Sequence, residues 1–254
     1  MQDAHNHLQD PRFEGIREDL IATMLTHGVS RCVVNGTSPE DWPQVAQLAE
    51  LYPELVIPSF GLHPWKTPSP NWQQQLTSYL DTVPHACIGE CGLDRWIKGY
   101  DIELQREVFT TQLDLASQRN LPLSIHCLKA WGLLIEILES RPLPQRGFLL
   151  HSYSGSAELI PHLAELGAYF SFSGYFLHQR KKNVRDAFKS VPPDRLLIET
   201  DAPDMLPPES CIDHPLEMEL NHPANISKIH DKASAILELS SVPKNFQRFF
   251  ESGF

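Results

Sequence analysis

Eight short apolar segments rich in β-branched and aromatic residues run along the chain, and stretches with helical periodicity separate them. Strands that alternate with helices form parallel sheets, and eight such repeats are typical of a closed (β/α)8 barrel, which usually has roughly 250 residues. We therefore predict one α/β domain, a TIM-type barrel over residues 1–254. The predicted strands are Ala4–His7, Cys32–Gly36, Leu55–Gly61, Ala86–Glu90, Leu123–His126, Phe148–His151, Tyr169–Ser173 and Leu196–Asp201.

The predicted helices end near glycine or proline, the residues that most often stop a helix. Gly28 follows the first helix, and Pro53 and Pro84 follow the next two. The proline-rich segment Pro203–Pro215 is predicted to be a long loop after the last strand rather than a domain boundary. The predicted helices are Pro11–Thr26, Pro39–Leu51, Asn71–Thr82, Glu103–Gln118, Ala130–Glu139, Ser156–Leu166, Lys181–Lys189 and Ala224–Leu239.

Charge and composition argue against several classes of protein. A formal net charge of -11 argues against a protein that covers nucleic acid with a basic surface, although bound divalent cations can give a nuclease local positive charge. No apolar run is long enough to span a membrane, and the first residues do not resemble a secretion signal. The five cysteines are scattered along the chain, which favours free thiols over a disulfide framework. We expect a cytoplasmic protein; the oligomeric state stays open, with a monomer favoured.

Polar residues at the ends of the apolar segments are candidates for the active site, because barrel enzymes place their sites at the carboxyl ends of the strands. His5 and His7 lie two residues apart on the first predicted strand, so their side chains face the same way. Four more strands end on a histidine or a carboxylate. The full set of candidate metal ligands is His5, His7, Glu90, His126, His151 and Asp201.

These six side chains together favour a metal site. A lone histidine at a strand end is more often structural than a ligand. Burying four histidines and two carboxylates at one rim without metal would leave several polar groups unpaired, at a cost of several kcal/mol. We predict two divalent cations of the Zn, Mn, Co or Ni type, which mixed imidazole and carboxylate donors favour, about 3.5–4 Å apart and bridged by Glu90.

Five motifs follow one another along nearly the whole chain: Asp3-Ala4-His5-Asn6-His7, Gly61-Leu62-His63-Pro64, Gly89-Glu90-Cys91-Gly92-Leu93-Asp94, His151-Ser152-Tyr153-Ser154-Gly155 and Glu199-Thr200-Asp201-Ala202-Pro203. They resemble the D-x-H-x-H, G-x-H-P, G-E-x-G-L-D, H-x-[FY]-[ST]-G and E-T-D-[SA]-P motifs of the TatD family of metal-dependent hydrolases, which belongs to the amidohydrolase-like barrels. The order and number of the motifs make this resemblance specific.

The resemblance implies a deoxyribonuclease of the 3'-5' exonuclease kind, with Mg²⁺ or Mn²⁺ as the usual working metal. The expected substrate is DNA, single-stranded or bound at an end, or a small phosphoester. We predict that Asp201 accepts a proton from the attacking water while Glu90 holds both ions. The resemblance assigns one ion to His5, His7, Glu90 and Asp201 and the second to Glu90, His126 and His151.

One position departs from the family pattern. Leu128 stands where the family usually has an arginine that would help to hold a phosphate. Lys129 is the next residue and is either a substitute point charge or a solvated residue at the start of a helix. His63 either donates to a substrate phosphate or is a turn histidine bound to the backbone. Three tryptophans near site motifs either pack at the rim or stack on a base: Trp65, Trp96 and Trp131.

Two other functions remain open. The first is an amidohydrolase, esterase or lactonase that acts on a small substrate at the same site. The missing arginine and the acidic charge of the chain favour this alternative. The second is a metal-binding or nucleic-acid-associated protein without turnover. The complete set of candidate ligands argues against this second alternative.

Overall fold

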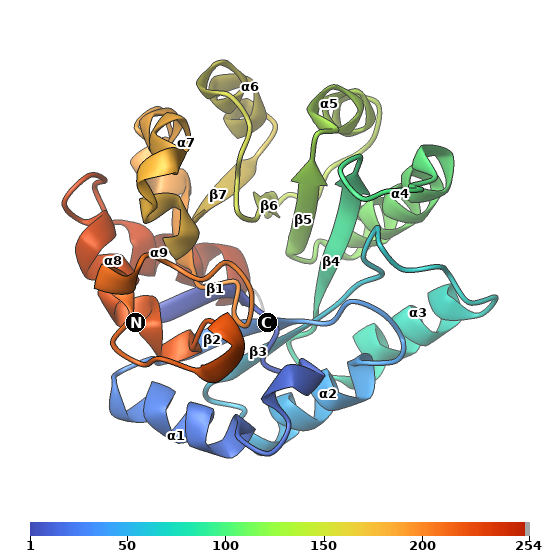
Figure 1. Cartoon of the computed structure of the whole chain (residues 1–254). Coiled ribbons are helices and arrows are strands. Elements are labelled where there is room, and N and C mark those ends of the chain that lie inside the picture. The colour runs from blue at the N-terminus through green and yellow to red at the C-terminus, as the bar shows by residue number, and fades with distance from the viewer. Residues whose placement is uncertain (252–254) are drawn as a thin grey trace.

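Each strand of the sheet pairs in parallel with the next strand along the chain, from the first to the eighth. The computed structural model describes residues 1–251. The sheet closes because the Asp201 N–H donates to the His5 carbonyl at 3.0 Å and the His7 N–H donates to the Ala202 carbonyl at 2.7 Å. The predicted TIM-type barrel is therefore confirmed (Figure 1). Its strands are β1 Gln2–Asn6, β2 Arg31–Asn35, β3 Val56–Phe60, β4 Cys87–Asp94, β5 Leu123–Leu128, β6 Phe148–Leu150, β7 Ala168–Ser173 and β8 Leu196–Glu199.

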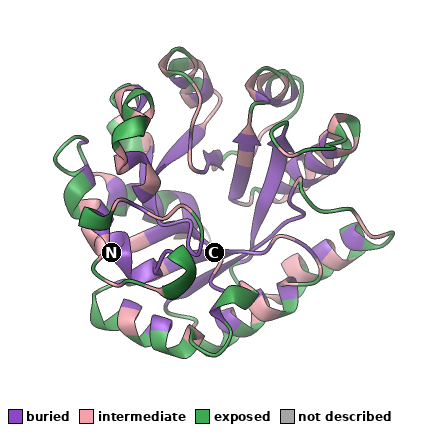
Figure 2. Ribbon diagram, in the orientation of Figure 1, coloured by how far each residue is buried: buried purple, intermediate pink, exposed green. Residues whose placement is uncertain are grey.

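Helices surround the sheet and cover its outer face (Figure 1). The strands are almost wholly buried, whereas the helices expose one side to solvent (Figure 2). Within residues 1–251, no helix is long and apolar enough to cross a membrane. The helices are α1 Arg17–Thr26, α2 Trp42–Leu51, α3 Trp72–Thr82, α4 Ile102–Arg119, α5 Trp131–Glu139, α6 Ile160–Glu165, α7 Lys182–Phe188, α8 Ile226–Ala233 and α9 Val242–Phe246.

Two helices depart most from their predicted ranges. The helix predicted over Pro11–Thr26 is interrupted at Gly15, whose φ of 81° turns the chain before α1 begins. The helix predicted over Ala224–Leu239 ends at Ala233. Beyond that point Leu237 is buried in the core from an irregular segment, so tertiary packing overrides the helical periodicity.

Two features of the strands and loops bear on the site. β4 was predicted to end at Glu90, but it continues to Asp94 and so carries two carboxylates on one strand. The segment Pro203–Pro215 forms the predicted long loop after β8, and its one regular turn is the 3-10 turn Glu209–Cys211.

The amino ends of the strands are filled by apolar side chains that were not predicted as a unit. α9 and the π turn that follows it bring three phenylalanines against residues from the first half or the middle of every strand except β5. This cluster closes one end of the barrel, so the opposite end, where the strands finish, is left for chemistry. Its members are Ala4, Val33, Ile57, Cys87, Leu149, Tyr169, Leu197, Phe246, Phe249 and Phe250.

We expect Phe249→Ala to lower the free energy of unfolding by about 3–5 kcal/mol, the usual cost of truncating a buried phenylalanine. Phe249 is fully buried, and its ring centroid lies 4.6 Å from that of Tyr169. Urea unfolding measures the change, with Phe249→Leu as a control that keeps most of the volume and loses less. Equal losses in the two variants would contradict a role for this ring in closing the barrel.

Candidate metal centre

Glu90 lies at the middle of the predicted cluster, and its two carboxylate oxygens face different histidines. Oε2 lies 3.3 Å from His5 Nε2 and 3.2 Å from His7 Nε2. Oε1 lies 2.9 Å from His126 Nδ1 and 2.8 Å from His151 Nε2. The structure therefore brings these five residues, from four strands, into one group with two sides.

Asp201 joins the side of the cluster that holds the first-strand histidines. Its Oδ1 lies 3.7 Å from His5 Nε2 and 3.6 Å from His7 Nε2. The carboxylate is held there because Asp201 follows β8 with a left-handed φ of 56° and its N–H bonds to β1. This arrangement matches the division in which Asp201 and the first-strand histidines serve one ion.

His5 and His7 lie on the same side of the cluster as Asp201, which we call the first side; His126 and His151 form the second side. Each histidine of the first side points its other ring nitrogen, Nδ1, toward a possible acceptor outside the cluster. His7 Nδ1 donates to the Asn35 carbonyl at 2.8 Å. His5 Nδ1 lies 3.0 Å from the Ser124 hydroxyl, which can accept its proton. With its proton on Nδ1, each neutral ring would present the lone pair of Nε2 to the cluster.

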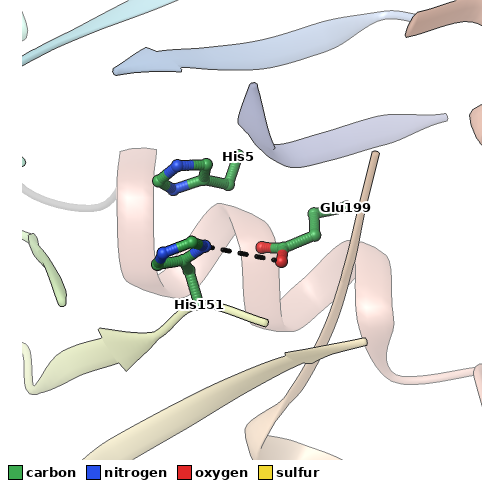
Figure 3. A group of neighbouring side chains, drawn as sticks. All are labelled: His5, His151 and Glu199. Atoms are coloured by element: carbon green, nitrogen blue, oxygen red, sulfur yellow. Dashed lines mark ion pairs between the residues drawn. The ribbon is translucent and has the colours of Figure 1, made fainter. Parts of the chain in front are cut away.

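A carboxylate also lies behind each histidine of the second side, at hydrogen-bond distance from His126 and at a longer ion-pair distance from His151. The sequence alone assigns neither carboxylate a role. Asp94 Oδ2 lies 2.8 Å from His126 Nε2, and Glu199 Oε1 lies 3.7 Å from His151 Nδ1 (Figure 3). A carboxylate behind a ligating histidine fixes its tautomer and raises its basicity. Both residues stand in recognised motifs, and the period of two on a strand puts Glu199 on the same face as Asp201.

Glu199 is held firmly in its place behind the cluster. It is fully buried, and Oε1 accepts from the Ser152 N–H at 2.7 Å and from the Ser152 hydroxyl at 2.6 Å. The Ser171 hydroxyl donates to its other oxygen. One carboxylate oxygen of Glu199 also lies within 4.8 Å of nitrogens of His5 and His151, so this group can also hold a cation.

His63 contacts the cluster in a different way. The Trp65 N–H donates to His63 Nδ1 at 3.1 Å, so the neutral ring carries its proton on Nε2. That nitrogen lies 3.2 Å from Glu90 Oε1. Although His63, Glu90 and His126 are close enough to share an ion, this tautomer makes His63 a hydrogen-bond donor rather than a ligand.

The structure does not bring the other predicted substrate contact into the cluster. Lys129 is exposed on a left-handed backbone with φ of 56°, and it makes no hydrogen bond or ion pair with another described residue. Leu128 ends β5 and is only half-buried. The position that usually carries an arginine therefore offers no cation, and Lys129 stays a prediction.

Burial sets the ionisation of the cluster. Burial and the neighbouring charge of His151 lower the pKa of His5 to about 3, so its lone pair stays available. Burial raises the pKa of Asp201 to about 7, because a carboxylate charge is costly away from water. Burial also opposes ionisation of Asp94, but hydrogen bonds from His126 and Trp65 outweigh it and lower the pKa to about 2.

The donor set fits divalent cations. The lone pairs and carboxylate oxygens converge, and the two sides share one carboxylate, as in sites that hold two ions. An eight-stranded barrel with buried histidine and carboxylate clusters at the carboxyl ends of its strands is a metal-dependent hydrolase of the amidohydrolase-like class. The chain belongs to the TatD family, because the family described as TatD related DNase matches residues 2–251.

Individual relatives agree with this assignment. The uncharacterized metal-dependent hydrolase YabD of Bacillus subtilis is 29% identical over 244 residues, which cover 94% of this chain and 91% of that protein. The 3'-5' ssDNA/RNA exonuclease TatD of Edwardsiella piscicida is 29% identical over 215 residues, which cover 82% and 81%. The crystal structure of YjjV, a TatD homolog from Escherichia coli, matches with a TM-score of 0.89 and 26% identity over 98% of this chain and 97% of that one. The family predicted from the five motifs is confirmed.

We expect Asp94→Asn to weaken Mn²⁺ binding about 10-fold to 100-fold, as is usual when the group behind a ligating histidine is changed. An amide cannot supply the charge that now faces His126 Nε2 at 2.8 Å. Titration calorimetry of metal-stripped protein measures the affinity. Asp114→Asn, on the exposed face of α4, is the control. Equal affinity in Asp94→Asn and the control would refute the role given to Asp94.

Proposed function

We propose that this protein is a deoxyribonuclease that hydrolyses phosphodiester bonds at the 3' end of single-stranded DNA with two divalent ions, Mg²⁺ or Mn²⁺. The proposal rests on one observation: the two carboxylate oxygens of Glu90, Oε1 and Oε2, face two separate groups of histidines. A single carboxylate between two donor sets suits a pair of ions, and paired ions stabilise both the attacking and the leaving oxygen in phosphate ester hydrolysis.

The donors divide between two ions. When bound, the ions would supply a water of lowered pKa and positive charge against the negative charge that develops on the phosphate. Glu90 would help to hold both ions, because its two oxygens face different histidines. The first ion would be held by His5, His7, Glu90 and Asp201, and the second by Glu90, His126 and His151.

The chain's own residues then move the proton and orient the ester. The oxygen of the attacking water bonds to phosphorus while Asp201 accepts a proton from that water. The bond from phosphorus to the leaving ester oxygen breaks, and this oxygen takes up a proton from solvent and departs as a hydroxyl group. His63 donates its Nε2 proton in a hydrogen bond to a phosphate oxygen, since Trp65 fills its other nitrogen. Asp94 and Glu199 keep the rings of the second side in position.

DNA is the substrate that the relatives favour. A TatD relative at 29% identity is named a 3'-5' ssDNA/RNA exonuclease. The formal net charge of -11 fits an enzyme that grips a strand end at its metal centre rather than one that coats a long duplex.

A second candidate rests on the half-buried Leu128, which replaces a usual phosphate-binding arginine. A small ester or lactone needs no such cation, and the same two-ion site could polarise its carbonyl. Turnover of p-nitrophenyl esters or lactones by a protein that leaves DNA intact would favour this candidate over the nuclease.

We expect metal-stripped protein to release nucleotides from a labelled single-stranded DNA oligomer only after Mg²⁺ or Mn²⁺ is added back. Asp201→Asn should reduce turnover by about 100-fold to 10,000-fold, because a positioned general base contributes about that factor. Gel or chromatographic analysis of the products measures the rate and shows whether cleavage starts at the 3' end. Asp81→Asn, which changes an exposed carboxylate on α3, is the control. Full activity of Asp201→Asn would exclude its assigned role.

A further inference from the structure

A half-exposed tryptophan stands directly beside the candidate centre. Trp65 is 50% exposed, although its indole Nε1 donates to buried Asp94 Oδ2 at 2.7 Å. Its ring stands nearly perpendicular to two site imidazoles, with centroids 5.0 Å from His63 and 6.1 Å from His126. The indole is therefore fixed along one edge while much of its surface stays open to solvent.

A cavity of about 220 Å³ begins beside this tryptophan. The loops after β3 and β4 and the first half of α4 line it. The loops contribute a tryptophan, a tyrosine, two lysines and one carboxylate, Asp101, which accepts from N–H groups at the start of α4. Lys66 and Lys98 are both exposed, and neither forms an ion pair within residues 1–251. Tyr100 is 44% exposed on the same wall. In a chain of strong negative charge, this small groove combines aromatic surface with cations next to the centre.

We propose that Trp65 is a stacking surface for the base of the nucleotide next to the scissile phosphodiester, and that Lys66 and Lys98 hold an adjoining phosphate. The inference rests on the proposed nuclease function and extends it to the recognition of single-stranded nucleic acid. Aromatic side chains combined with cations along a groove are the usual means of binding single strands without reading their sequence.

This pairing also accounts for the leucine at position 128. The cations beside Trp65 stand on the loops that follow β3 and β4, and β4 pairs with β5, the strand that ends at Leu128. The groove therefore supplies positive charge that the usual arginine position lacks. The groove is lined by both Trp65 and His63, the residue proposed to bind the phosphate. The base next to that phosphate is therefore the flat group that would lie on the ring of Trp65.

Trp65 has a second contact that the test must separate from stacking. Its indole N–H helps to hold Asp94, which in turn holds His126. Trp65→Ala removes both the ring and the N–H, whereas Trp65→Phe keeps a ring that can stack and removes only the N–H. Trp96→Ala removes a comparably exposed indole, 60% exposed, that does not line the groove.

The experiment measures kcat/KM with Mn²⁺ for two single-stranded DNA oligomers. One carries natural bases, and the other carries abasic sugar residues at its last two 3' positions. We expect Trp65→Ala to lower kcat/KM on the natural oligomer by about 5-fold to 150-fold, the usual effect of losing one stacked base. On the abasic oligomer Trp65→Ala should match the wild-type chain. Trp65→Phe should keep most of the activity on natural DNA, and Trp96→Ala all of it.

Two results would overturn the inference. Equal losses of Trp65→Ala on both oligomers, shared by Trp65→Phe, would show that the indole acts only through Asp94. No loss on either oligomer would show that Trp65 does not contact the substrate. Both results require that the wild-type chain cleaves the natural oligomer. A wild-type chain that cleaves neither oligomer would instead refute the proposed nuclease, and the stacking role with it.

Discussion

The two oxygens of the Glu90 carboxylate point to two groups of histidines, and the rest of the candidate centre is arranged around this contact. A carboxylate that is 3% exposed is costly unless charge or hydrogen bonds compensate it. The barrel provides that compensation by ending separate strands on imidazoles at one rim. The Asn35 carbonyl and the Asp94 carboxylate then fix which nitrogen of His7 and of His126 faces inward. The centre is therefore prepared for cations before they bind.

One end of the barrel is an apolar core that stabilises the fold, and the other end carries the candidate site. At the amino ends of the strands, the phenylalanines of α9 and the turn after it form a purely apolar cluster. At the carboxyl ends, the side chains are polar, buried and hydrogen-bonded to one another. Asp3 joins these regions, because it accepts from the Thr200 N–H at 2.9 Å and from the Thr200 hydroxyl at 2.6 Å where β8 closes on β1. The same closure positions Asp201, because the Asp201 N–H donates to the His5 carbonyl, so the geometry of the site depends on the closed barrel.

The sequence predicts the barrel, and it selects six side chains that the structure brings together, because alternating strands and polar strand ends are local signals. It does not assign roles to Asp94 or Glu199, since their work depends on which imidazole lies beside them across the barrel. Because β4 was expected to end at Glu90, the sequence did not place Asp94 on the same strand. The sequence also did not predict the early end of α8, because the long-range packing of Leu237, rather than helical periodicity, determines where that helix ends. The tautomer of His63 depends on one backbone N–H and needs coordinates.

The most direct test of this account is a crystal structure of the protein soaked with Mn²⁺, with an anomalous difference map recorded to locate the ions. The account predicts two peaks, one on each side of the Glu90 carboxylate and about 3.5–4 Å apart, as in known two-metal sites. One peak should lie among His5, His7 and Asp201, and the other between His126 and His151. A single ion, or a second ion held by His63 instead of His151, would contradict the division of ligands on which the account depends.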